Sequence, residues 1–141
     1  MTLNQDLVGR EYEEVSFKVA RDRVVQFADA IGDDDPRYRE GDSPIAPPTF
    51  PTVMQIATGS QVVLDQDLGL DYTRVVHGEQ EYVIERPLRV GDELRAKPRI
   101  SEIYAKGPNE FLVIETVVED ADGEVVVTGR STLISRGTAA P

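Results

Sequence analysis

The spacing of apolar residues predicts two helices in the first half of the chain. Between residues 20 and 31, apolar side chains recur every three or four positions, which places them on one face of a helix. Gly32 follows at a position where helices commonly end, and the proline that closes residues 33–36 forbids continuation. Between about residues 50 and 64, apolar residues surround the helix on most sides, so we expect a buried helix at the centre of the fold.

The second half of the chain has the pattern of strands. Four segments are rich in Val, Ile, Tyr and Phe, partly alternate with polar residues, and are separated by turn residues. They are residues 75–85, 93–104, 110–119 and 124–135, and a short strand at 14–19 precedes them all. Strands that follow one another against one long helix favour an α+β fold. We therefore predict an antiparallel sheet of about five strands, curved around the central helix.

Length and charge indicate one domain over residues 1–141 and exclude some partners. There is no internal repeat and no linker, and only the weakly apolar tail at 137–141 is expected to fray. A net charge of -11 disfavours binding to nucleic acid or to an anionic membrane surface. The N-terminus lacks the pattern of a signal peptide and no apolar run is long enough to span a bilayer, so we expect a cytoplasmic protein.

The residue types also argue against metal or cofactor chemistry. The chain has no cysteine and one histidine, and its carboxylates show no metal-ligand spacing. No glycine-rich nucleotide-binding motif is present. We expect neither a metal nor a cofactor.

Three segments carry candidate chemistry and a family resemblance. They read GDDDPRY at 32–38, APPTF at 46–50, and VHGEQ at 76–80 with RPLRVGD downstream at 86–92. Over residues 7–135 the chain resembles the MaoC-like dehydratase and (R)-specific enoyl hydratase family, which carries G-D-x-N-P-x-H and R-P-x-x-x-G-D. It is most similar to the subunit that lacks the catalytic histidine in the heterodimeric (3R)-hydroxyacyl-ACP dehydratases of mycolic-acid synthesis. The resemblance implies a hotdog fold.

The resemblance assigns the first motif to acid–base chemistry. In the family, its aspartate and histidine act together on water and on the Cα proton of an acyl thioester. Asp33 matches the aspartate, but Tyr38 stands at the histidine position and Asp35 at that of the asparagine. A tyrosine ordinarily titrates near 10, against ~6.5 for histidine, so Tyr38 is a poor general base at neutral pH. The plainer interpretation is a polar turn after a helix, with Tyr38 covering the edge of the core.

The other two segments suggest further contacts. His77, the only histidine, lies on a predicted strand and is the natural substitute base if the fold brings it near Asp33; packing alone is the commoner role. Gly78 follows it as a substrate-binding candidate. The segment Pro48, Thr49 and Phe50 precedes the buried helix, whose free N–H groups could polarise a thioester carbonyl. Thr49 is also the expected N-cap.

These features favour one function and leave others open. The first is a (3R)-hydroxyacyl-thioester dehydratase or enoyl-thioester hydratase subunit of fatty-acid metabolism, acting on acyl-CoA or acyl-ACP. It is expected as a homodimer, or as a heterodimer with a catalytic MaoC-like subunit that supplies the histidine. The alternatives are an autonomous homodimeric hydratase that uses Asp33 with His77 or a water, a non-catalytic acyl-thioester binding subunit, and a thioesterase.

Overall fold

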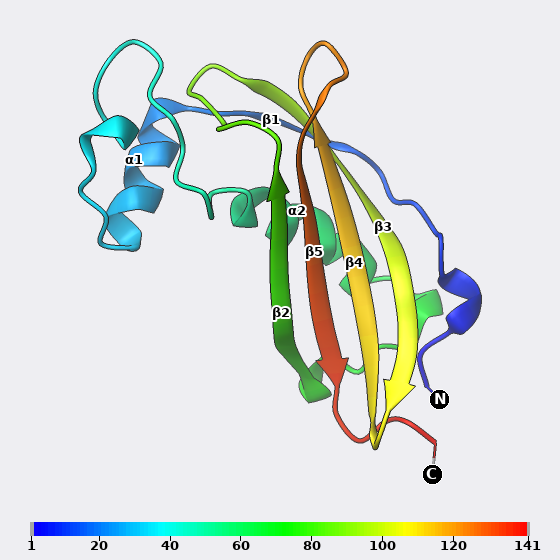
Figure 1. Cartoon of the computed structure of the whole chain (residues 1–141). Coiled ribbons are helices and arrows are strands. Elements are labelled where there is room, and N and C mark those ends of the chain that lie inside the picture. Colours follow the sequence, from blue (N-terminus) through cyan, green and yellow to red (C-terminus); the bar gives the residue numbers. More distant parts are fainter. Residues whose placement is uncertain (1, 141) are drawn as a thin grey trace.

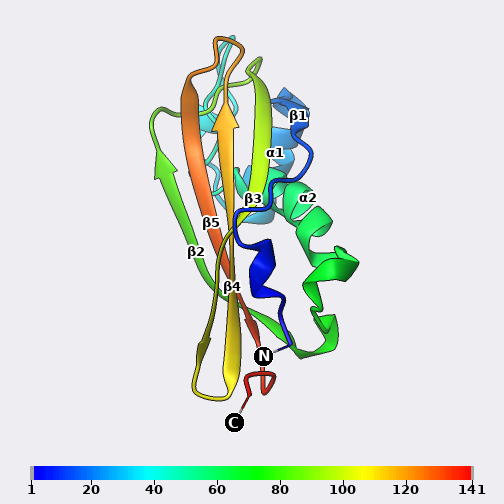
Figure 2. The same ribbon diagram turned by 90° about the vertical axis from the view of Figure 1, so that its right-hand side faces the viewer.

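An antiparallel sheet forms one layer of the molecule and two helices with the N-terminal segment form the other (Figure 1), as Figure 2 shows from the side. The computed structural model describes residues 2–140. The main elements in chain order are β1 (Val15–Lys18), α1 (Arg21–Ala30), α2 (Thr52–Val63), β2 (Val75–Ile84), β3 (Glu93–Lys106), β4 (Asn109–Glu119) and β5 (Val125–Ser135). Across the described chain the strands are ordered β1-β3-β4-β5-β2, which confirms the predicted α+β class.

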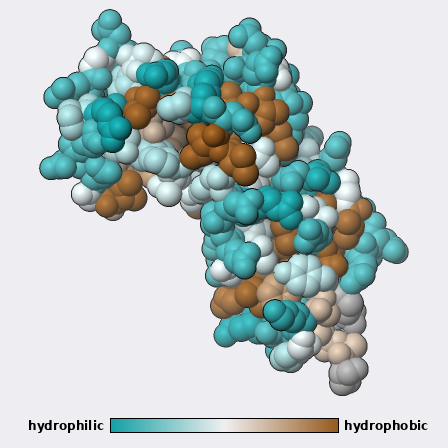
Figure 3. Space-filling model, viewed as in Figure 1, coloured by the Kyte–Doolittle hydropathy of each residue, from teal (hydrophilic) through white to brown (hydrophobic). Residues whose placement is uncertain are grey.

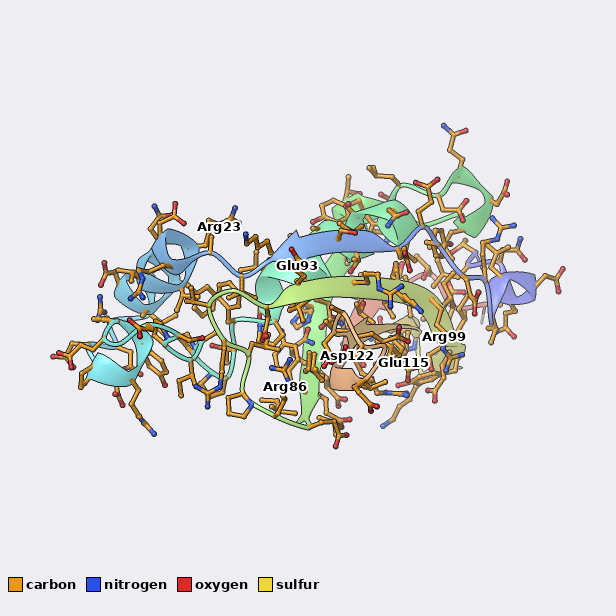
Figure 4. The ribbon with its side chains drawn as sticks, turned by 90° about the horizontal axis from the view of Figure 1, so that it is seen from above. Arg23, Arg86, Glu93, Arg99, Glu115 and Asp122 are labelled. Atoms are coloured by element: carbon orange, nitrogen blue, oxygen red, sulfur yellow. The ribbon has the colours of Figure 1, made fainter. Side chains whose placement is uncertain are left out.

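The pleat of the long strands separates a core face from a solvent face. On β3 the buried residues Leu94, Ala96 and Ile100 alternate with basic residues that point outward. On that outer face Arg99 pairs with Glu115 on β4 over 2.9 Å, and Figure 4 shows both on the side of β3 away from α2. Such partly exposed pairs add little stability, at most about 1 kcal/mol each. The inner face is therefore the one that builds both the core and any site.

Helix α2 lies over only part of that inner face. It packs against β3, β1 and β4, burying Met54, Thr58 and Val62. Ile56 is 70% exposed and Leu64 77% exposed on its other side. The prediction of a helix buried on most sides is therefore wrong for the single chain, because the sheet covers one face of the helix and leaves its opposite apolar face open.

One further expectation is corrected at the start of α2: the helix begins after Pro51, and its N-cap makes no side-chain hydrogen bond, so Thr49 is not the cap. In the described part of the tail, Gly137 N donates to Asn109 Oδ1 over 3.0 Å and Ala139 N to the Pro108 carbonyl over 3.1 Å. Residue 141 lies outside the described residues.

No helix within residues 2–140 combines the length and apolar character that a membrane crossing requires.

Candidate active site

A cavity of about 1020 Å³ lies beside α2, over the part of the inner sheet face that the helix leaves uncovered. Side chains of α2 line one wall, and β2 and β5 supply the other. The exposed apolar residues Ile56, Leu64 and Tyr72 stand around it. A volume of this size lies at the upper end of what small-molecule sites in proteins show, roughly 300–1,000 Å³.

Four polar side chains form a connected chain across this cavity. The Ser131 hydroxyl on β5 donates to Gln80 Oε1 over 2.6 Å, and His77 Nε2 lies 3.1 Å from the same oxygen. The Gln80 amide then donates from Nε2 to Gln55 Oε1 on α2 over 2.6 Å. This places the Gln55 NH₂ group at the free end of the chain. Gln55 Nε2 is buried and has no hydrogen-bond partner within residues 2–140.

Gly129 on β5 makes room for the Gln55 amide. A Cβ at this position would overlap Gln55 Oε1 and come within 3.1 Å of Gln55 Cδ and 3.3 Å of the Tyr82 ring. A glycine inside a strand commonly marks such a close approach. The amide of Gln55 therefore lies directly against the sheet backbone. Any residue other than glycine at position 129 would place its Cβ in the space that this amide occupies.

The N-terminal end of α2 is polar on the cavity side but has few free amides. The Thr52 hydroxyl is hydrogen-bonded to the Tyr82 hydroxyl. Burial raises the pKa of Tyr82, so its phenol stays protonated at neutral pH. The N–H groups of Phe50, Thr52 and Val53 already donate to carbonyls of the preceding turn, over 2.9 to 3.0 Å. These three amides are therefore not free to polarise a bound carbonyl.

The far end of the cavity is apolar and carries one carboxylate. Val75 and Leu133 from the sheet and Leu70 from the loop after α2 line it. Among the described lining residues, the one carboxylate is that of Asp65, whose oxygen accepts 2.7 Å from the Tyr12 hydroxyl and 2.9 Å from Arg10 Nη1. The hydrogen bond from Tyr12, with those from the Asp67 backbone and Arg10, holds the pKa of Asp65 below its usual value. Asp65 is therefore ionised and already accepts hydrogen bonds from Tyr12 and Arg10, which makes it a poor base.

Asp33 and Tyr38 lie away from the large cavity. Asp33 follows α1, and its carboxylate accepts a hydrogen bond from the Asp35 backbone over 3.0 Å, as in an ordinary polar turn. Asp35 in turn pairs with Arg37 over 2.7 Å. The hydrogen bonds from the Arg37 side chain and backbone lower the pKa of Asp35. Tyr38 is buried in the core cluster around α1 and lines a separate cavity of about 170 Å³, together with Pro48.

The remaining predicted residues divide between core and edge. Phe50 is buried, with its ring edge-on to Phe27 at 5.5 Å between centroids, and Thr49 is exposed in the turn before α2. Gly78 sits in the β-bulge between His77 and Glu79, where a Cβ would come within 2.6 Å of the Ile134 side chain. The bulge lets both His77 and Gln80 face the cavity. Of the predicted residues, only His77 lines it.

The residues that shape the cavity most were therefore missed from the sequence. Gln55, Ser131 and Gly129 come from α2 and β5 and carry no motif. Two weak signals existed: the amides Gln55 and Gln61 inside the apolar run of residues 50–64, and a glycine inside the last strand. Within residues 2–140 no group of three histidine or carboxylate side chains is placed to hold a metal ion.

Comparison with known proteins fits this architecture. Residues 6–129 match the family model described as FAS1-like, dehydratase domain region. A UPF0336 protein from Saccharopolyspora erythraea is 39% identical over 148 residues, covering 99% of this chain and 95% of the relative. The UPF0336 protein Franean1_6066 from Parafrankia sp. is 41% identical over 150 residues, covering 100% and 99%.

Solved structures give the same fold. The HadBC (3R-hydroxyacyl-ACP dehydratase) complex from Mycobacterium tuberculosis is similar with a TM-score of 0.78 and 25% identity, over 88% of this chain and 92% of that one. A MaoC-like dehydratase gives a TM-score of 0.86 at 21% identity, over 95% of this chain and 43% of that one. The hotdog fold expected from the motifs is thus confirmed, and the chain belongs to the FAS1-like dehydratase region family and to the UPF0336 proteins.

Proposed function

We propose that the chain is a hydro-lyase subunit for (3R)-hydroxyacyl or enoyl thioesters that binds the acyl group and depends on a histidine-bearing partner for proton transfer. One observation carries the proposal. The only histidine, His77, lines the large cavity, whereas Asp33 of the family motif lies outside it and Tyr38 is buried in the core.

Dehydration of a β-hydroxyacyl thioester needs an acid and a base at one face of the substrate. The Cα proton must be removed while the β-oxygen is protonated as it leaves as water. A positioned acid or base contributes about 10²- to 10⁴-fold each. In a single copy of this chain, Asp33 and His77 line no common cavity, and Asp65 is held as an occupied carboxylate. A partner that brings an aspartate and a histidine to the cavity would supply the missing pair.

The cavity suits an acyl thioester better than a compact polar substrate. Its far end, at Leu70, Val75 and Leu133, is apolar, and its other end, at Gln55 and Gln80, presents amides. A hydrocarbon tail gains free energy in the first region, roughly 0.8 kcal/mol for each CH₂ removed from water. A carbonyl head meets hydrogen-bonding groups in the second.

The free edge of the sheet supports a partner on the same side. β2 is an edge strand of ten residues, with Val76, Val83 and Ile84 exposed. Figure 3 shows the molecular outline hollowed beside this edge, below the lobe formed by α1 and its loop. A long open edge with exposed apolar residues is a template for pairing with another strand. A subunit paired there would also cover Ile56 and Leu64 on α2. HadBC, which has a similar fold, is a complex of two chains.

The test is to isolate the tagged chain from its native source together with bound subunits, and to assay the complex for hydration of a long trans-2-enoyl thioester. We expect a second hotdog subunit that carries the aspartate–histidine pair, and turnover that is lost when that histidine is replaced. A complex that binds the thioester without turning it over would instead establish a non-catalytic binding subunit. Thiol release without hydration would establish a thioesterase.

A further inference from the structure

We propose that Gln55 is the specificity-determining donor of the cavity: its Nε2 donates a hydrogen bond to the thioester carbonyl oxygen of the bound acyl group. The proposal deepens the acyl-thioester function above and rests on it. It names the atom that recognises the head of the substrate and the direction in which the acyl chain lies.

The Gln55 NH₂ group is an unsatisfied buried donor. Gln55 is 6% exposed, and its Nε2 is the one buried side-chain nitrogen or oxygen within residues 2–140 that has no hydrogen-bond partner. Burying a donor without an acceptor costs about 1–3 kcal/mol. Native structures keep few such groups, and each calls for an explanation, such as a catalytic role or a bound water or ion. Since Gln55 lines the cavity, an acceptor on a bound molecule can satisfy it.

The direction of the hydrogen bonds leading to Gln55 determines what this side chain can still bind. Gln80 Oε1 receives the Ser131 hydroxyl at 2.6 Å and faces His77 Nε2 at 3.1 Å, so its NH₂ group points to Gln55. Gln55 Oε1 is thereby occupied as an acceptor. What Gln55 has left to offer a ligand is a donor. The partner must therefore be a hydrogen-bond acceptor, such as a carbonyl oxygen, rather than an ammonium or a hydroxyl proton.

The side chain of Gln55 is held in place from two sides. Gly129 leaves the space in which the Gln55 amide rests, and Gln80 fixes the amide from the other side. Both restraints come from the sheet, which is rigid, rather than from a surface loop. A hydrogen-bonding side chain locked in this way is preorganised for a ligand and loses little entropy on binding.

The position of Gln55 along α2 indicates which oxygen of the ligand it would bind. The backbone amides of Phe50, Thr52 and Val53, at the end of the helix where a carbonyl was expected to bind, are already engaged. Gln55 lies one turn further along α2, between that end and the apolar region at Leu70. A tail buried in the apolar region places the polar head of the acyl group, and hence its thioester carbonyl, beside Gln55.

The experiment compares two ligands on one protein. S-decanoyl-N-acetylcysteamine carries the carbonyl, and S-decyl-N-acetylcysteamine has a CH₂ in its place. Titration calorimetry with the full chain should give about tenfold tighter binding of the thioester, the amount that one added hydrogen bond supplies. In Gln55→Met the ratio should fall to about one. In Gln61→Met, a matched change on the same helix whose amide instead donates to the Glu13 carbonyl, the ratio should stay near ten.

The outcomes separate the inference from the function beneath it. A fraction of misfolded protein lowers the number of binding sites for both ligands alike and leaves the ratio intact, and Gln55→Leu serves as a second variant. Equal binding of both ligands to the unaltered chain, or a tenfold ratio that survives in Gln55→Met, overturns the role of Gln55 while leaving acyl binding intact. Binding of neither ligand overturns the acyl-thioester function and the inference with it.

Discussion

The Gln80 amide reaches across the cavity from β2 and donates to Gln55 Oε1 on α2 at 2.6 Å. Together with the hydrogen bond between the Thr52 and Tyr82 hydroxyls, it joins α2 to β2, although α2 packs mainly on β3, β1 and β4. It leaves the NH₂ group of Gln55 facing the cavity. The geometry of the candidate site therefore depends on a pair of side chains 25 residues apart in sequence.

Gly129→Ala is expected to destabilise the chain through Gln55. The added methyl group would overlap the Gln55 amide and crowd the Tyr82 ring, and overpacking of this kind costs typically about 1–3 kcal/mol. In a Gln55→Ala background the same change should cost much less, because the overlapping amide is gone. Urea denaturation of the two single variants and the double variant measures this coupling free energy. Additive losses would show that Gly129 is needed for the strand rather than for seating Gln55.

Glu110→Gln is expected to lower the free energy of unfolding by about 1–3 kcal/mol at pH 7. The Glu110 carboxylate is fully buried and accepts hydrogen bonds from the Thr2 hydroxyl at 2.7 Å and from the Leu3 backbone at 3.0 Å, tying the N-terminal segment to β4. A glutamine offers one acceptor oxygen in place of two. Urea denaturation measures the loss, and Glu124→Gln, at an exposed position in the turn after β4, is the matched control.

The effect of Glu110→Gln should depend on pH in a defined direction. Burial raises the pKa of Glu110, but the hydrogen bonds from Thr138, Thr2 and Leu3 outweigh it and hold the pKa below the usual 4.5. The carboxylate therefore stabilises the fold above about pH 4.5, and this contribution is lost as the pH falls through the lowered pKa. The difference in the free energy of unfolding between the unaltered chain and Glu110→Gln should therefore become smaller below pH 4.5. A difference of the same size at pH 7 and at pH 3 would rule out the ionised carboxylate as the cause.

Val83→Lys is expected to weaken the association of this chain with the proposed partner subunit. Val83 is exposed on β2, at the free edge of the sheet, and a lysine there opposes strand pairing. Sedimentation equilibrium should show a dissociation constant raised by roughly tenfold or more, corresponding to about 1.4 kcal/mol. Val125→Lys places the same change at an exposed position of β5, which lies between β4 and β2 and is not an edge. Equal weakening by both variants would show that the association does not use the β2 edge.

Much of the fold was accessible from the sequence because its signals are local. The β-branched runs predicted the four long strands, and the glycine at 32 and the proline at 36 predicted the end of α1. The burial of α2 was overestimated because apolar residues around a helix do not reveal which of its sides the rest of the chain covers. Ile56 stays exposed in the single chain, and the proposed partner would cover it.

The site was only partly accessible. His77 stood out as the single histidine, but Gln55, Gln80 and Ser131 meet only because the register pairs Gln80 with Ser131 and α2 crosses above them. No spacing in the sequence encodes that register. The family motif, in turn, drew attention to Asp33, which the fold places in a polar turn outside the large cavity.

The most direct test of the account is hydration of a long trans-2-enoyl thioester by the purified chain alone and by its native complex, each with and without Asp33→Asn in this chain. We expect no turnover by the chain alone. The complex should be active, and Asp33→Asn should change its rate by less than about threefold, because the general acid and base, worth about 10²- to 10⁴-fold each, come from the partner. Turnover by the chain alone that disappears in Asp33→Asn would contradict the account and establish a complete enzyme.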